Sequence, residues 1–273
     1  MEPEVRWGSW AGRQRRHVEG NCWIDRPPRE SSSALPVVLV GLISWAGLAF
    51  AQSSEPSHSP NAASEADSIK PSVSDLRPQV TLRVYNYAHL DSEFLLNARQ
   101  VVAAIFRAAD VEAMWIDCPL SPEEFERYPA CQQKARTTDF VVRLITASMA
   151  ARVPTNDGPL GFAQRCPDDE RECVATVFYA KVDELAVRGD ARAHRILGHA
   201  IAHEVGHLLL GPNAHSSSGL MRGLWTPDNL RFMNWSYLFF TPRQCNQLRA
   251  SLGRRNKLEL QSDLQSSNLS PGK

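Results

Sequence analysis

Three residues in the C-terminal half of the chain have the types and the spacing of a metal-dependent hydrolytic site. The run His203-Glu204-Val205-Gly206-His207 places two imidazoles four residues apart. On a helix that spacing puts both rings on one face, where they can bind one zinc ion. Glu204 lies one residue from the first ring and can act on a zinc-bound water. The sequence therefore predicts a zinc site with a carboxylate as general base.

The segment that carries these residues has the pattern of a helix packed on a core. Its apolar residues share one broad stripe: Ile196, Leu197, Ala200, Ile201, Val205, Leu208 and Leu209. We expect the helix to span Ala191 to Leu210, with Asp190 capping its start and Gly211 its end. His199 lies about 12 Å along the axis from His207, too far to share its zinc. We therefore expect His199 and His194 to be polar residues near the site or surface histidines.

Two histidines leave zinc without its third protein ligand, and His215 is the nearest candidate downstream. Gly211 can adopt the left-handed conformation that ends a helix, and Pro212 prevents its continuation, so the chain must turn back toward the metal. Asp228, in the turn-like run from Thr226 to Asn229, is the alternative third ligand.

The histidine motif, together with the residues that follow it, resembles the zinc signature and Met-turn of the metzincin metallopeptidases: His203, Glu204, His207, Gly211, His215 and Ser218-Gly219-Leu220-Met221. The pattern here is a variant, H-E-x-x-H-x-x-x-G-x-x-x-H, with one additional residue on each side of the glycine. The resemblance implies a zinc ion held by His203, His207 and His215, with Met221 packed beneath it. It also implies peptide hydrolysis by a zinc-bound water, with Glu204 as general base.

The rest of the sequence predicts the elements that would position this site. Four runs have the composition of strands: Val80–Tyr87, Val111–Asp117, Phe140–Thr146 and Ala175–Ala180. Asp91 is expected to cap a helix after the first strand, and Leu160–Gln164 is either a short edge strand or a loop. Thr241-Pro242-Arg243-Gln244 is a capping box that starts a last helix, expected to end near Leu252.

Together with the resemblance, these elements imply an α+β, metzincin-like catalytic domain. It would contain a mixed twisted sheet, an N-terminal helix, the zinc-binding active-site helix, the Met-turn and a C-terminal helix. An extended substrate could pair with the edge at Leu160–Gln164, and Trp225, just past the Met-turn, is expected to wall a side-chain pocket.

Composition divides the chain into four parts. Residues 1–51 have the pattern of a signal peptide, or of a signal anchor, with a long N-region: Ala34–Phe50 is apolar, and Ala49-Phe50-Ala51 matches a small-x-small cleavage site. Residues 52–79 are rich in Ser, Pro and Ala, as in a disordered linker. Residues 80–255 suit one zinc metallopeptidase-like domain, and residues 256–273 a disordered polar tail.

Export would place the cysteines in an oxidising compartment. Removal of the leading segment takes away Cys22, and short loops then favour the disulfides Cys118–Cys131 and Cys166–Cys173. Cys245 is expected to be left over.

Charge limits the classes of partner. The chain has 30 basic and 30 acidic side chains, which argues against nucleic-acid binding. The expected partner is a peptide or protein substrate, with membrane contact only if Ala34–Phe50 is retained. The expected location is extracytoplasmic, either secreted or periplasmic. Two alternatives are a non-catalytic extracytoplasmic zinc-binding or interaction protein and a membrane-anchored envelope factor. Glu204 favours the peptidase, because a structural zinc site has no use for a general base.

Overall fold

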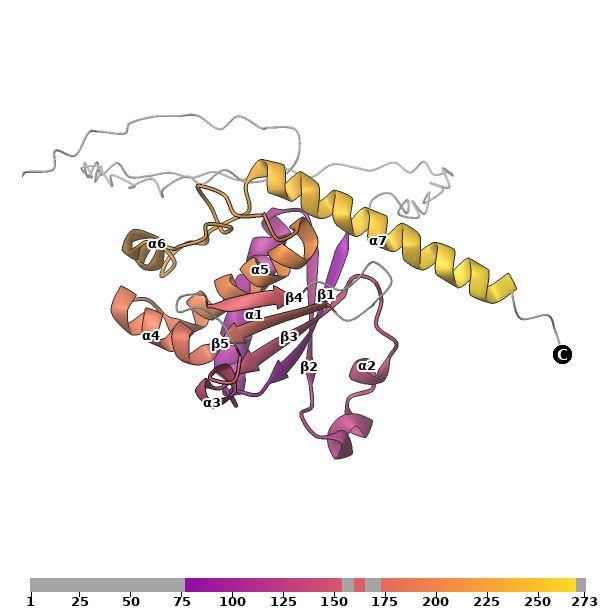
Figure 1. The fold of residues 1–273 in the computed structure, drawn as a ribbon, viewed down its shortest axis with the longest axis horizontal. Coiled ribbons are helices and arrows are strands. Elements are labelled where there is room, and N and C mark those ends of the chain that lie inside the picture. Colours follow the sequence, from indigo (N-terminus) through magenta and orange to yellow (C-terminus); the bar gives the residue numbers. More distant parts are fainter. Residues whose placement is uncertain (1–76, 154–159, 165–172, 269–273) are drawn as a thin grey trace, which may run out of the picture. The chain divides into compact units, whose positions relative to one another are not determined.

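The computed structural model describes residues 77–153, 160–164 and 173–268. The part described contains a five-stranded sheet in the order β2-β1-β3-β5-β4 (Figure 1). The strands are β1 (Gln79–Asn86), β2 (Glu112–Cys118), β3 (Asp139–Ile145), β4 (Gly161–Gln164) and β5 (Cys173–Phe178). Strands β2, β1, β3 and β5 run parallel to one another, whereas β4 pairs antiparallel with β5. The predicted mixed sheet is thereby confirmed, and Leu160–Gln164 is a strand rather than a loop over most of its length.

Helices connect and cover the strands. The longer ones are α1 (Ser92–Ala108), α4 (Tyr179–Gly189), α5 (Ala193–Leu210) and α7 (Pro242–Asn268). Short ones are η2 (Pro122–Arg127), α2 (Pro129–Gln132), α3 (Ala147–Ala150) and α6 (Pro227–Phe232). None of the helices within the described ranges is long and apolar enough to cross a membrane. Ala34–Phe50 lies outside these ranges.

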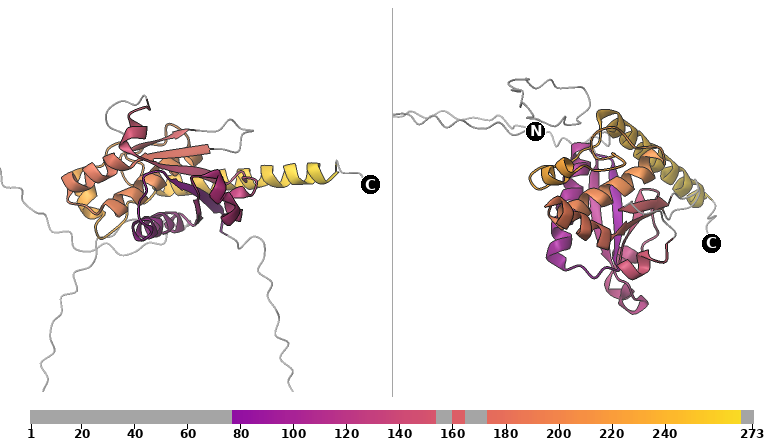
Figure 2. Two further views of the ribbon diagram at one scale, coloured as in Figure 1. Left: turned by 90° about the horizontal axis from the view of Figure 1, so that it is seen from below. Right: turned by 60° about the vertical axis from the view of Figure 1, so that its left-hand side comes forward.

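Strand register brings the core side chains together on one face of the sheet. Leu82 is level with Trp115 on β2 and with Phe140 on β3, and Phe140 is level with Cys173 on β5. All four side chains are buried. Since neighbours in register point to the same face, they form one apolar row across the sheet. Helices α1 and α5 pack against each other and complete this core (Figure 2).

The contact between α1 and α5 depends on Gly198. A Cβ atom at Gly198 would lie 2.5 Å from Cβ of Val101 and 2.7 Å from the carbonyl oxygen of Ala98. These distances are shorter than van der Waals contact, so only glycine allows α5 to approach α1 this closely. The close packing fixes the position of the helix that carries His203 and His207.

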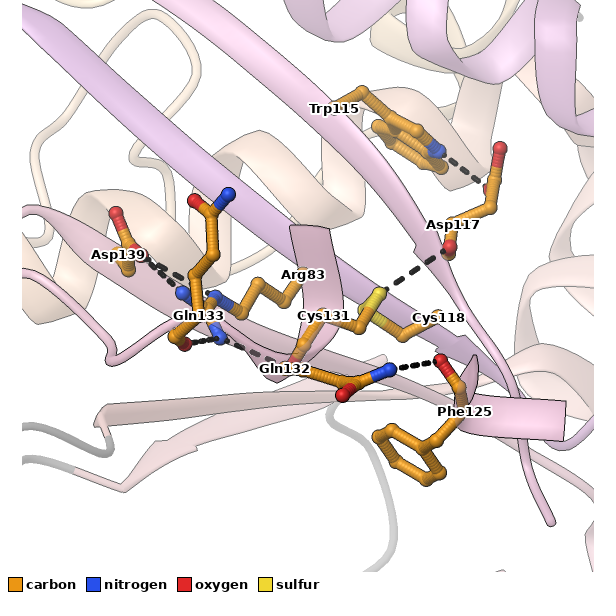
Figure 3. Close-up of a disulfide and its surroundings, with 9 residues drawn as sticks. All are labelled: Arg83, Trp115, Asp117, Cys118, Phe125, Cys131, Gln132, Gln133 and Asp139. Carbon is orange, nitrogen blue, oxygen red and sulfur yellow. Dashed lines mark hydrogen bonds and ion pairs between the residues drawn. A yellow bond between two sulfur atoms is a disulfide. The ribbon is translucent and has the colours of Figure 1, made fainter. Parts of the chain in front are cut away.

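A disulfide loop is fastened to the sheet by a buried ion pair (Figure 3). Cys118 and Cys131 form a disulfide. Arg83 on β1 donates from Nη2 to Oδ2 of Asp139 over 2.8 Å, and from Nη1 to the carbonyl oxygens of Cys131 and Gln133 over 3.3 and 2.8 Å. Because Arg83 and Asp139 are both buried, the guanidinium links the loop rigidly to β1 and β3.

The disulfide predictions have mixed outcomes. Cys118–Cys131 is confirmed, and a bridge of this kind is typical of proteins from oxidising compartments. Cys166 lies outside the described residues, so the Cys166–Cys173 pairing stays a prediction. Cys173 and Cys245 are each disulfide-bonded, and the expectation that Cys245 is left over is therefore wrong. That expectation ranked pairs only by loop length, and loop length changes the closure entropy too slowly to select a partner.

Helix α4 was not anticipated, and it changes the role of Asp190. Asp190 lies in the left-handed region, at φ 48° and ψ 48°, as the C-cap of α4. The N-cap of α5 is Arg192, with no side-chain hydrogen bond. The prediction that Asp190 caps the zinc helix is wrong, because Asp tolerates the left-handed conformation and here ends the preceding helix.

Helix α7 begins as predicted but runs further. Its capping box is present: Gln244 Oε1 accepts from the Thr241 N–H over 3.0 Å, and Thr241 Oγ1 accepts from the Gln244 N–H over 3.4 Å. The helix then continues past Leu252 to Asn268 (Figure 1). Contacts with the turn before β3 support the extension, since Thr137 donates from its N–H to Glu259 and from Oγ1 to the Arg255 carbonyl oxygen.

Candidate metal centre

Helix α5 carries two of the candidate ligands, and the loop that follows it carries the third. His203 and His207 are one turn apart on α5. Gly211 has φ 104°, and its N–H donates to the His207 carbonyl oxygen over 2.9 Å. This confirms Gly211 as the cap of the helix. The chain then turns and brings His215 back toward the first two rings.

The three rings converge through their Nε2 atoms. His207 Nε2 lies 3.1 Å from His203 Nε2 and 3.1 Å from His215 Nε2. One ligand atom from each ring can be chosen so that all three lie within 4.8 Å of one another. Zinc–nitrogen bonds of about 2.0–2.1 Å in tetrahedral geometry separate nitrogens by about 3.3 Å. The two pairs that include His207 therefore have about the separation of two ligands of one zinc ion.

Hydrogen bonds at the other ring nitrogens fix which atoms can bind a cation. Nδ1 of His203 donates to the Leu220 carbonyl oxygen over 2.9 Å, and Nδ1 of His207 donates to the Gly211 carbonyl oxygen over 3.2 Å. In a neutral imidazole the Nε2 atom then carries a lone pair and no proton. Two such lone pairs repel rather than form a hydrogen bond, and a shared cation removes that repulsion.

Burial keeps these imidazoles neutral. Loss of solvation lowers the pKa of His203 to about 4, although its hydrogen bond to Leu220 opposes the shift. Burial likewise lowers the pKa of His207. Neutral imidazole is the form that ligates metal, so the environment prepares the two rings for binding near neutral pH.

Glu204 is buried beside strand β4. Burial raises its pKa to about 8. A Cβ atom at Gly161 would lie 3.0 Å from Cγ of Glu204 and 2.4 Å from the Thr176 carbonyl oxygen. Glycine at this position therefore lets β4 lie directly against the carboxylate side chain.

Met221 and Trp225 form the support behind the triad. A Cβ atom at Gly206 would lie 2.8 Å from Sδ of fully buried Met221, so this side chain packs against α5 between the histidines. Trp225 donates from Nε1 to the Leu220 carbonyl oxygen over 3.2 Å, and its ring meets that of His203 edge-on at 5.9 Å. One carbonyl thus accepts from both His203 and Trp225. Sequence reasoning did not find this carbonyl, because a backbone group has no residue-type signal.

The triad opens into a cleft of about 640 Å³. Glu204 and the three histidines line it together with β4, part of α4 and the segment 222–225. Trp225 is among the lining residues, as the sequence predicted. A substrate in the cleft would meet the triad, Glu204 and residues of β4 at once.

The alternative third ligand lies elsewhere. Asp228 is in the first turn of α6, is exposed, and forms an ion pair with Arg231 at 2.5 Å. It does not join the three histidines in the metal-binding cluster that the described residues form.

His199 is buried, not a surface histidine. Its Nδ1 donates to the Arg195 carbonyl oxygen over 2.7 Å, and its Nε2 accepts from the Leu238 N–H over 3.0 Å. Both ring nitrogens are thereby occupied, and neither is directed to the triad. Full burial lowers the pKa of His199 to about 4. His194 is partly exposed, with its ring edge-on to Phe94.

Comparison with known proteins adds only weak structural likeness. No protein-family model matches the chain, and no curated protein matches it either. Among solved structures, the crystal structure of archaemetzincin from Methanopyrus kandleri aligns with a TM-score of 0.39 at 16% identity, over 65% of this chain and 97% of the other. Likeness at this level carries no argument about fold or function.

Proposed function

We propose that this protein is a zinc-dependent metallopeptidase of a metzincin-like type, acting on peptides or proteins outside the cytoplasm. The observation that carries the proposal is the convergence of the Nε2 atoms of His203, His207 and His215 beside a buried Glu204, inside an open cleft. The Cys118–Cys131 disulfide supports the oxidising location.

The three histidines would hold the zinc, and Glu204 would transfer protons beside it. Zinc in such a site supplies a Lewis acid that polarises a carbonyl oxygen and lowers the pKa of bound water to about 7. The carboxylate form of Glu204 would be favoured by a zinc ion on these three neutral imidazoles, against the effect of burial. Glu204 takes a proton from the attacking water and returns it to the leaving nitrogen.

Strand β4 supplies a means to bind the substrate backbone. It lies at the end of the sheet order, paired only with β5 among the described strands, and its residues line the cleft. An extended peptide can add to such an edge through main-chain hydrogen bonds, which present the scissile carbonyl independently of side-chain identity.

A peptide-library cleavage assay tests the proposal. The full-length protein, loaded with zinc, is incubated with an unbiased library, and the products are compared with those of Glu204→Gln. We expect Glu204→Gln to keep its zinc and fold but to lose hydrolysis by several orders of magnitude, because base and proton shuttle are removed together. Equal activity of the two proteins would refute the mechanism. A zinc-loaded wild type that cleaves no member would instead indicate the non-catalytic zinc protein.

A further inference from the structure

Among the described residues that line the cleft with the triad, positive side chains outnumber negative ones. Lys181 and Arg188 reach it from α4, and Arg222 reaches it from the segment just after Met221. The carboxylates that line it within the described residues are Glu184 and Glu204. Three cations thus face two carboxylates, before any charge at the histidines is counted.

The two carboxylates do not neutralise all three cations. Arg188 Nη2 lies 3.1 Å from Glu184 Oε1, so these two exposed side chains pair with each other. Glu204 also lines the cleft, but its side chain is buried against β4. Lys181 contacts the face of the Phe178 ring, with Nζ 5.4 Å from its centre. A ring contact of this kind holds the ammonium in place without cancelling its charge.

Arg222 and Lys181 border the cleft from different elements. Arg222 precedes Gly223, where a Cβ atom would lie 3.4 Å from Nδ1 of His215, so the backbone next to Arg222 lies close to the triad, and Arg222 lines the same cleft. Lys181 belongs to the first turn of α4, directly after β5. Neither side chain has an ion-pair partner in the part of the chain that the structure describes. Both are half-buried, which strengthens their attraction to a bound anion relative to a fully solvated charge.

We propose that this cleft selects acidic peptides, with Arg222 and Lys181 contacting Asp or Glu side chains on the residues next to the scissile bond. The inference depends on the proposed peptidase function and names its substrate class. The chain as a whole has 30 basic and 30 acidic side chains, so general attraction to the protein does not supply this preference. Cations that lack an ion-pair partner in a cleft attract ligands of opposite charge and speed their association.

The test uses pairs of fluorogenic peptides that are identical except that Asp and Glu are replaced by Asn and Gln. Cleavage of each pair is measured with zinc-loaded wild type and with Lys181→Gln, Arg222→Gln, the double variant and Arg254→Gln. The last is the matched control: it removes one positive charge from an exposed position on α7, outside the cleft. Affinity for the same peptides is measured by fluorescence anisotropy with zinc-loaded Glu204→Gln, alone and combined with Arg222→Gln.

We expect wild type to favour the acidic member of each pair by about tenfold in kcat/KM at low ionic strength, with the ratio falling as salt is added. The ratio should approach one in the double variant and stay at the wild-type value in Arg254→Gln. Equal cleavage of both members by wild type would overturn the acidic preference while leaving the peptidase function intact. If wild type cleaves neither member, the peptidase function fails, and the anisotropy measurement decides the charge preference alone: equal affinities would overturn it.

Discussion

Gln244 donates a hydrogen bond from Nε2 to the carbonyl oxygen of Ala214 over 2.9 Å, and Ala214 is the residue immediately before His215. The same nitrogen lies 3.3 Å from Oγ of Ser216, the residue immediately after His215. The side chain is buried, and its Oε1 accepts from the Thr241 N–H in the capping box of α7. One amide therefore joins the start of α7 to both neighbours of the third candidate ligand.

Substitution Gln244→Glu should weaken zinc binding by about 10- to 100-fold, the usual effect of losing a group that orients a ligand. Glutamate keeps an acceptor for the Thr241 N–H, as in other capping boxes, but as a carboxylate it cannot donate to the Ala214 carbonyl oxygen. Zinc affinity is measured at pH 7.5 by competition with a chromophoric chelator, and the stability of the metal-free protein is measured in parallel.

Thr241→Val is the matched control for this prediction. It removes the Oγ1 acceptor of the capping box and leaves the amide of Gln244 in place. The free energy of unfolding should therefore fall by about 1 kcal/mol, while zinc affinity stays near wild type. Equal zinc affinity in Gln244→Glu and wild type would show that the amide does not position His215.

Arg83→Met should destabilise the domain by about 3–5 kcal/mol, because it leaves the carboxylate of Asp139 buried without its partner. Denaturant unfolding of the oxidised protein measures the loss. The double variant Arg83→Met/Asp139→Leu should recover a large part of it, since no buried charge then remains.

The exposed pair formed by Arg188 and Glu184 provides the comparison. Arg188→Met should change the free energy of unfolding by less than about 0.5 kcal/mol, as is usual for solvated pairs within a helix. Equal effects of Arg83→Met and Arg188→Met would mean that the buried pair does not hold the disulfide loop to the sheet.

Acid should destabilise the metal-free protein through His199. The pKa of His199 is about 4 in the folded state, against 6.5 for an unperturbed histidine. The unfolded chain therefore binds the proton first as pH falls, and stability decreases between about pH 6.5 and pH 4. The difference between the two pKa values corresponds to a loss of about 3 kcal/mol in the free energy of unfolding.

Urea unfolding of wild type and His199→Gln across this pH range, with chelator present, isolates that contribution. The stability advantage of wild type over the variant should be largest above pH 7 and should shrink steadily toward pH 4. An advantage that stays constant with pH would show that His199 protonates equally in the folded and unfolded states.

The sequence predicted the elements whose signals are local. The apolar stripe on α5, the Asp91 cap of α1 and the capping box of α7 each depend on residues within a few positions, and all three are present. The positions of His203 and His207 follow from helix geometry alone. The approach of His215 was predicted from the glycine and proline that end α5.

Features set by distant contacts were missed or wrong. Helix α4 follows β5 without a side-chain cap or a breaking residue, so the end of the strand was placed too late and Asp190 was assigned to the wrong helix. Buried His199 accepts a hydrogen bond from the Leu238 N–H, 39 positions away. Gln244 bonds to Ala214, which lies 30 positions from Gln244 and is the neighbour of His215. Such separations leave no periodic pattern in the sequence.

If His203, His207 and His215 bind one zinc ion together, dialysed protein should retain that zinc. Zinc is counted per chain by mass spectrometry for wild type, His215→Ala and Asp228→Ala. We expect one zinc in wild type and in Asp228→Ala, and severe loss in His215→Ala, because His215 joins the cluster and Asp228 does not. Zinc retained in His215→Ala but lost in Asp228→Ala, or no zinc in wild type, would contradict a three-histidine zinc site.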